Sequence, residues 1–453
     1  MGILLRLAGP LWQGDLFAFD IVFGALCSFA AGWLFTAICA RVSRQSRPFT
    51  LGVVLLVVLG GGIGFVAAEA GLAHHENLVW GSLWGLSWTT NSLVTWELGY
   101  HAIFWAGVAA IVSGRLLLAV AAALLLVALH PFTFGVFAIF AGCWWLAHEL
   151  RRAPARRELA LRLVLPVGAI GLAGVIVYEK LLPDRSYDAE FMRAVYKQLA
   201  YSISAGYIAL FALPVLIVLA VVIVSRSRVE DAEAAAPRDA GPPAALAFLL
   251  AAAVLALVAV SRPLTHAVPQ PAHWTRVYLV AFIAIGALAM RPMAPARRRP
   301  AAVVVGVLAL LGLVDSALSV APLRDRLVDV GPPTVVDRDT VRLVDALRDL
   351  PSRRLAYVRG CATANAFPSI EYAISALTDQ HPPYGHFAFS PNVAARQRGF
   401  VLCGRDDAGP QLPAGIWVVT DRGLGHRLRL RALRSVGRFE LGVSPAGSAS
   451  GRS

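Results

Sequence analysis

The segment between residues 69 and 97 holds the densest group of side chains that could take part in chemistry. Glu69, His74, His75 and Glu76 lie close together in it. A carboxylate or an imidazole here could act as a general base, and the same groups could hold a divalent cation that bridges phosphates. The alternative is a hydrated loop whose polar side chains only face water. Tryptophans follow at about helical spacing and favour a helix lying in a membrane interface: Trp80, Trp84, Trp88 and Trp96.

Two carboxylates near the start of the chain are further candidates. Asp15 and Asp20 flank the first long apolar run. A carboxylate at the mouth of a helix bundle is costly to bury and is often functional. The alternatives are a solvated Asp15 and an Asp20 that only caps a helix.

Histidines and bases elsewhere could bind a phosphate or a sugar. His130 precedes Pro131 between two apolar runs, Lys180 and Arg185 lie in an amphipathic loop, and His266 and Arg276 form a third polar cluster with His273. The bases could pair with a lipid phosphate. A hydrogen-bonded structural histidine and surface salt bridges are the competing interpretations.

The sequence has no motif for a common nucleotide, serine-hydrolase or zinc site. P-loop, GxSxG, HExxH and C-x-x-C patterns are all missing. We therefore assign no metal ligand, and expect either no cofactor or a divalent cation, Mg²⁺ or Mn²⁺, held with phosphates.

The elements that must position these residues are apolar runs. The chain of 453 residues is 57% hydrophobic and 15% charged, against about 45–50% and about 25% in soluble domains. This excess predicts an all-α polytopic membrane domain of about ten transmembrane helices. The runs are 18–40, 49–68, 98–114, 116–130, 132–150, 160–178, 204–225, 244–261, 274–290 and 301–320.

Arginines in alternate gaps between these runs orient the domain. Bases near the ends of membrane spans are retained on the cytoplasmic side. This explains the formal charge of +13 without a nucleic-acid partner, and it puts the candidate loops, the start of the chain and the tail after Ala321 outside the cytoplasm. We expect a multi-pass protein of the bacterial cytoplasmic (inner) membrane. The clusters are Arg41/Arg44/Arg47, Arg151/Arg152/Arg156/Arg157, Arg226/Arg228/Arg238 and Arg291/Arg297/Arg298/Arg299.

Composition divides the chain into a transmembrane domain (1–321), a small extracytoplasmic α/β domain (322–445) and a disordered tail (446–453). Residues 337–350 predict an amphipathic helix, residues 369–377 a second helix, and 355–360, 415–421 and 437–443 predict strands. Cys361 and Cys403 could form a disulfide there or remain two thiols. Residues 1–17 do not have the features of a signal peptide, so we expect that an upstream span is missing or that Met1 is not the natural start.

Two segments resemble GT-C-type membrane glycosyltransferases. The first is SGRLLLAVAAALLLVALHPFTFGVFAIF (113–140), in which a Gly-Arg turn leads into a span that ends at an outward His-Pro. The second is EYAISALTDQHPPYGHFAF (371–389), which is similar to a "YAL-x-x-LTGR" segment of the extracytoplasmic domain, although Asp379-Gln380 replaces the Gly-Arg. The likeness covers most of residues 96–440.

The resemblance implies transfer of a sugar from a polyprenyl-phosphate donor to an acceptor at the outer membrane face, with membrane lipid as the other partner. In that family the catalytic acid lies in the outside loop after the first span. If that span is missing here, the loop is cut short at Met1, and the acid would be Asp15 or Asp20, and less favourably Glu69 or Glu76. Lys180, Arg185 or Arg276 would neutralise the leaving phosphate.

Two other functions compete with glycosyl transfer. A transporter or flippase of lipid-linked or polar molecules predicts ionisable residues inside the spans and paired broken helices. The spans look nearly uncharged, and Gly60-Gly61-Gly62 has no obvious counterpart. A non-catalytic, truncated membrane subunit is the second competitor.

Overall fold

We analysed a computed structural model of the chain. It describes residues 16–60, 62–73, 88, 95–151, 156–177, 205–226, 241–260, 271–330, 338–351, 355–360, 374, 378, 380, 401–402, 412 and 414–445. Two compact units emerge: one is drawn from Phe23–Leu182 and Gln198–Asp325, and the other holds the chain after Arg326.

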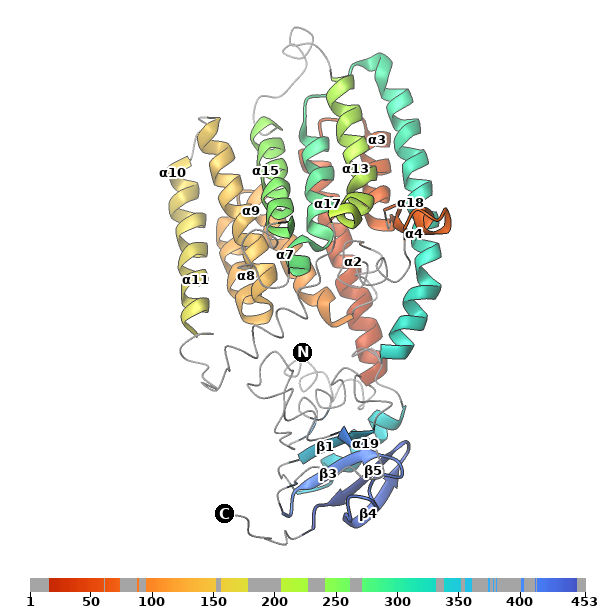
Figure 1. The fold of residues 1–453 in the computed structure, drawn as a ribbon. Helices are drawn as coiled ribbons and strands as arrows, with labels where there is room; N and C mark the ends of the chain where they lie inside the picture. The colour runs from red at the N-terminus through yellow and green to blue at the C-terminus, as the bar shows by residue number, and fades with distance from the viewer. Residues whose placement is uncertain are drawn as a thin grey trace. The chain divides into compact units, whose positions relative to one another are not determined.

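The larger unit is a bundle of helices (Figure 1). Every predicted apolar run contains helix, because long apolar segments satisfy their backbone groups internally in this form. The helices are α2 (Leu16–Val42), α3 (Arg47–Leu59), α4 (Gly64–Glu69), α7 (Thr95–Val112), α8 (Leu116–Leu129), α9 (Pro131–Leu150), α10 (Arg156–Leu159), the π-helix η1 (Ala160–Val164), α11 (Leu165–Ile176), α13 (Ala205–Ser225), α15 (Gly241–Val260), α17 (Pro271–Ala289) and α18 (Pro295–Val330).

Two of these helices differ from the predicted runs. The run at 49–68 is interrupted between α3 and α4, around Gly60 and Gly62, and α18 is much longer than the run at 301–320. Among the described residues, five helices are long and apolar enough to cross a membrane: Val22–Val42, Pro131–Leu150, Arg157–Ile176, Ile208–Ser225 and Pro295–Ser319. The other apolar helices are shorter, so ten crossings remain a prediction.

The outer surface of the bundle is apolar. Phe29, Trp33, Leu117 and Leu172 are among the large side chains that face outward, and Leu117 is 84% exposed. Such surface is unfavourable in water and favourable against lipid tails. The bundle is therefore built as a membrane protein.

The core of the bundle is aromatic and is built where α15 packs on α9 and α17. Phe140, Phe248 and Phe282 meet there with ring centroids 4.8 to 5.6 Å apart. Phe104 and Trp105 of α7 join this group and are fully buried. These rings pack the middle parts of α7, α9, α15 and α17 against one another.

Backbone hydrogen bonds gather three of the arginine-rich turns at one end of the bundle. Arg44 N donates to Leu288 O at 2.9 Å, and Ala294 N donates to Ser225 O at 2.9 Å. Gln45 Nε2 also donates to Met290 O at 3.1 Å. The turns after α2, α13 and α17 thus lie together, as the alternating charge pattern requires.

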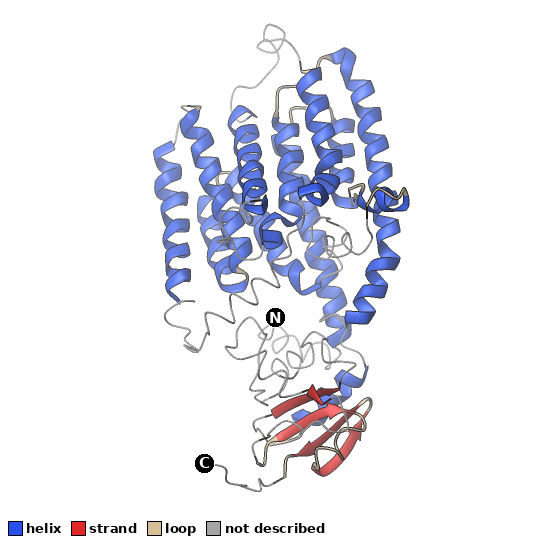
Figure 2. Ribbon diagram, viewed as in Figure 1, coloured by secondary structure: helices blue, strands red, loops and turns tan. Residues whose placement is uncertain are grey.

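The second unit holds the sheet, coloured red in Figure 2. Helix α19 (Arg338–Arg348) and strands β1 (Leu355–Gly360), β3 (Trp417–Asp421) and β5 (Phe439–Val443) confirm the predicted segments, while β2 (Val401–Leu402) and β4 (Arg431–Val436) were not predicted. The strand order is β2-β1-β3-β5-β4; β1 is parallel to β2 and β3, and β5 is antiparallel to β3 and β4.

The sheet unit has its own small core. Leu343 and Leu347 of α19 pack with Tyr357, Val419 and Phe439 of the strands. Of the segment 369–377 the structure describes only Ile374, which is helical. Cys361, Cys403 and residues 446–453 lie outside the described residues.

Candidate functional site

Most of the predicted site residues lie outside the described part of the chain. Asp20 and Arg276 lie in described helices, but their side chains are not described. Asp20 lies inside α2, beyond its first turn, and Arg276 lies in α17. Glu69 is exposed at the last position of α4. His130 is the remaining predicted site residue whose side chain is described. Those outside the description are Asp15, His74, His75, Glu76, Lys180, Arg185 and His266.

His130 is the joint between α8 and α9. Its backbone is extended (φ −155°, ψ 93°), because the ring of Pro131 disfavours the helical region for the preceding residue. Pro131 itself suits the first helical position, where no N–H is needed. His130 Nδ1 then accepts a hydrogen bond from Thr133 N at 3.2 Å and caps α9.

A chain of buried polar side chains runs from this joint into the bundle. Thr133 Oγ1 lies 2.8 Å from His130 Nδ1 and 3.5 Å from the hydroxyl of Tyr278, on α17. The same hydroxyl lies 2.5 Å from Nδ1 of His101, on α7. Thr133, Tyr278 and His101 are 0%, 0% and 2% exposed, whereas His130 is half-buried. We name His130, Thr133, Tyr278 and His101 the polar chain.

One placement of protons satisfies all of these contacts. If His101 Nδ1–H donates to Tyr278, the tyrosine hydroxyl donates to Thr133 and the threonine hydroxyl donates to His130 Nδ1, each of these three contacts joins one donor to one acceptor. His130 Nδ1 is then an acceptor, so the neutral ring carries its proton on Nε2. The neutral His130 is thus the tautomer that carries N–H at Nε2.

Aromatic rings hold the polar chain in place. Tyr100 stacks on His130 with centroids 4.2 Å apart and planes inclined by 6°. Phe104 lies against Tyr278 at 4.1 Å. Phe132, two residues after His130, meets Trp274 of α17 edge-on at 6.2 Å. Since α7, α9 and α17 all contribute, the arrangement depends on the tertiary fold rather than on one segment.

The position of the polar chain separates it from the basic turns. Helices α8 and α9 both have His130 at one end, and their other ends lead to Arg115 and Arg151. At about 1.5 Å per residue, these helices are roughly 20 to 30 Å long. The charge pattern therefore predicts that His130 lies at the outer membrane face.

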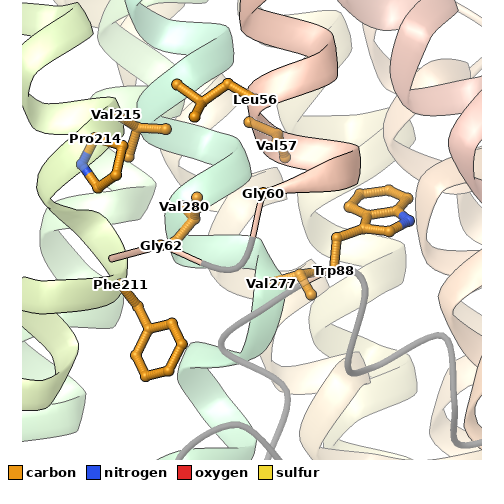
Figure 3. A pocket seen from close by; sticks show the side chains of 10 residues that line it. All are labelled: Leu56, Val57, Gly60, Gly62, Trp88, Phe211, Pro214, Val215, Val277 and Val280. Carbon is orange, nitrogen blue, oxygen red and sulfur yellow. The ribbon is translucent and has the colours of Figure 1, made fainter. Parts of the chain in front are cut away.

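A small pocket is lined by side chains of α3, α13 and α17 (Figure 3). Its lining is apolar, and Trp88 stands at one side of it. The wall holds no ionisable group, so it offers no acid or base. The lining residues are Leu56, Val57, Gly60, Gly62, Trp88, Phe211, Pro214, Val215, Val277 and Val280.

Sequence reasoning missed three polar residues that the structure buries. His101 and Tyr278 lie in the runs 98–114 and 274–290, which were predicted only as apolar helices. Asp315 is fully buried in α18, in a run that looked uncharged. A single carboxylate inside an apolar run of this length is a signal that could have identified it.

The fold and site together define a helical membrane protein with a His–Tyr–Thr–His chain, buried except at His130, and a separate mixed sheet. Among the described residues, no three His, Cys, Asp or Glu side chains are grouped to hold a metal ion. Comparison with protein-family models, curated protein sequences and solved structures gives no match.

Proposed function

We propose that the protein transfers a sugar from a polyprenyl-phosphate donor to an acceptor at the outer face of the membrane. The observation that carries the proposal is the polar chain, which fixes the half-buried His130 as an N–H donor at the end of the bundle opposite the basic turns. It lies within the His-Pro segment that resembles the GT-C enzymes.

The roles follow from the charge that develops during transfer. The acceptor hydroxyl attacks the anomeric carbon, the bond to the phosphate oxygen breaks, and negative charge grows on the leaving phosphate. Nε2–H of His130 would donate to an oxygen of that phosphate, and a base among Lys180, Arg185 and Arg276 would add positive charge. A carboxylate would accept the hydroxyl proton; the candidates are Asp15, Asp20, Glu69 and Glu76.

One substitution separates the chemistry of His130 from its structural role. In His130→Asn, the side-chain oxygen can still accept from Thr133 N, because asparagine is a favourable N-cap, but the Nε2–H donor is lost. We expect transfer to fall tenfold or more while the thermal midpoint stays close to that of the wild type.

The matched control lies at the other end of the same helix. His148 Nδ1 lies 2.8 Å from Trp144 O, and His148→Gln should leave transfer unchanged. Equal transfer by His130→Asn and the wild type would remove His130 from the mechanism. Equal loss in both variants would show only general damage to α9.

Transport of a lipid-linked or polar molecule is a second candidate, favoured by the interrupted α3–α4 segment. Broken helices beside a buried carboxylate are typical of transport proteins. Vesicles containing the purified protein would test it: protein-dependent movement of a fluorescent polyprenyl-phosphate sugar between leaflets, without sugar transfer, would favour transport over transfer.

A further inference from the structure

The interruption between α3 and α4 exposes backbone groups that two neighbouring helices then satisfy. Helix α3 ends at Leu59, and α4 begins at Gly64. Inside an apolar bundle, the free carbonyls and N–H groups at such a break need partners. The break has a positive-φ residue, Gly62 (φ +92°), whose hypothetical Cβ would lie 2.7 Å from Phe211 Cα of α13.

Helix α13 supplies one partner through its proline. Pro214 has no N–H, so it leaves the carbonyl of Leu210, four residues earlier, without its usual helical donor. Ile63 N, in the break, donates to Leu210 O at 3.4 Å. The carbonyl that the proline leaves free in α13 thus accepts a hydrogen bond from an N–H that the glycine-rich break leaves free. The sequence did not reveal this pairing.

Helix α18 supplies the other partners from one face. Gly312, Asp315, Ser316 and Ser319 follow the i, i+3, i+4, i+7 spacing that puts them side by side. Gly312 lets α18 approach the break, since a Cβ there would lie 2.9 Å from Gly60 Cα. Ser316 Oγ donates to Leu59 O, at the end of α3, at 2.9 Å.

Asp315 completes the contact at the start of α4. Its Oδ1 accepts from Val66 N at 2.9 Å. Its Oδ2 is also buried, yet it has no hydrogen-bond partner among the described residues. An asparagine would supply the same cap through its oxygen, so capping alone does not account for a carboxyl group.

No described cation lies on the packed elements near this carboxyl group. The charged side chains described on α3, α4 and α18 are Arg47, at the start of α3, Glu69, at the end of α4, and Arg297 to Arg299, at the start of α18. Arg299 is 16 residues from Asp315 along α18, roughly 24 Å. None of the described side chains supplies a counter-charge, and an ionised carboxylate without one is strongly unfavourable in an apolar interior.

We propose that Asp315 is a proton-binding site inside the membrane domain. Oδ2 carries the proton, and Oδ1 remains the acceptor for Val66 N–H. Because the same group holds α4 against α18, occupancy by the proton is linked to the docking of α4. This site is independent of the proposed glycosyl transfer and would serve a transport function equally.

Infrared spectroscopy of the full-length protein in lipid nanodiscs tests the proposal directly. A protonated carboxylic acid has a carbonyl stretch above the amide band, and the stretch shifts downward in D₂O. At pH 7 we expect this band in the wild type and its loss in Asp315→Asn, which keeps the cap on α4. Ser316→Ala is the matched control: it weakens the same helix contact but retains the carboxyl, so the band should persist. If the wild type and Asp315→Asn have the same infrared spectrum above the amide band, the proposal is wrong.

A second measurement does not depend on a variant that folds. The stretch Pro300–Arg324 contains Asp315 as its only carboxylic side chain, so label found there by mass spectrometry identifies the residue. An apolar carbodiimide, which reacts with protonated carboxyls, should label this stretch of the native protein at pH 7. Protection by Na⁺ at constant pH would overturn the proposal in favour of a sodium site. A native stretch that stays unlabelled at pH 5 and pH 7, but is labelled after denaturation in detergent at pH 5, would also overturn it.

Discussion

Replacing Tyr278 by phenylalanine tests whether the polar chain is one connected structure. The substitution removes a single hydroxyl that lies 2.5 Å from His101 Nδ1 and 3.5 Å from Thr133 Oγ1. The ring itself keeps its packing against Phe104. Any effect therefore reports on the hydrogen bonds rather than on lost apolar volume.

The magnitude follows from burial. His101 and Thr133 are almost completely inaccessible to water, so neither can replace the lost hydroxyl with solvent. Depriving a buried polar group of a partner costs about 1–3 kcal/mol. In a large domain, each kcal/mol lowers the thermal midpoint by about 2–4 °C. We expect Tyr278→Phe to lower it by about 2 °C or more.

A double-mutant cycle with Thr133→Val sharpens this test. Both substitutions break the same chain of donors and acceptors, so their effects should not add, with a coupling of about 0.5 kcal/mol or more. Thermal unfolding in detergent, followed by near-ultraviolet circular dichroism, measures all four proteins. An unchanged midpoint in Tyr278→Phe, or strictly additive effects, would refute the connected chain.

Three further predictions concern stability elsewhere. Gly62→Ala should destabilise the bundle by about 1–3 kcal/mol, because it adds a Cβ at positive φ against the backbone of α13. Gly71→Ala, also at positive φ but with open space around it, should cost less. The thermal midpoints of the two variants test this difference. Gln380→Leu should destabilise the sheet unit by about 1–3 kcal/mol, because Nε2 bonds to three carbonyls at and beyond the end of α19, and hydrogen exchange of the strands measures the loss. Asp345→Ala, which removes an exposed ion pair on α19, should change that exchange little. Similar effects of the two glycine variants, or faster exchange in Asp345→Ala than in Gln380→Leu, would contradict these assignments.

The apolar pattern predicted most of the helices, because a long apolar run can pair its own backbone N–H and carbonyl groups only as a helix. Gly60-Gly61-Gly62 marked a possible break, but the pattern could not show what satisfies it, because the partners Leu210 and Asp315 are distant in sequence. Strand β4 was missed for another reason. Its sequence RALRSV is charged, and its register against β5 is irregular between Arg431 and Arg434, so it lacks the alternation of a half-buried strand.

Of the candidate site, the sequence predicted His130 but not its partners His101 and Tyr278. The dipeptide His130-Pro131 marks a helix joint in any sequence, so His130 could be selected. His101 and Tyr278 are far apart in the chain, and only the packing of α7 on α9 and of α17 on α9 brings them to Thr133. Such a contact has no local signature.

Release of polyprenyl phosphate is the most direct measure of the proposed function. The purified full-length protein, in lipid, would be given a panel of polyprenyl-phosphate sugars together with membrane-derived acceptors. The account predicts that at least one donor is consumed, with sugar transferred to acceptor in equal amount to the polyprenyl phosphate released. A folded protein that consumes none of these donors, and releases no polyprenyl phosphate, would contradict glycosyl transfer.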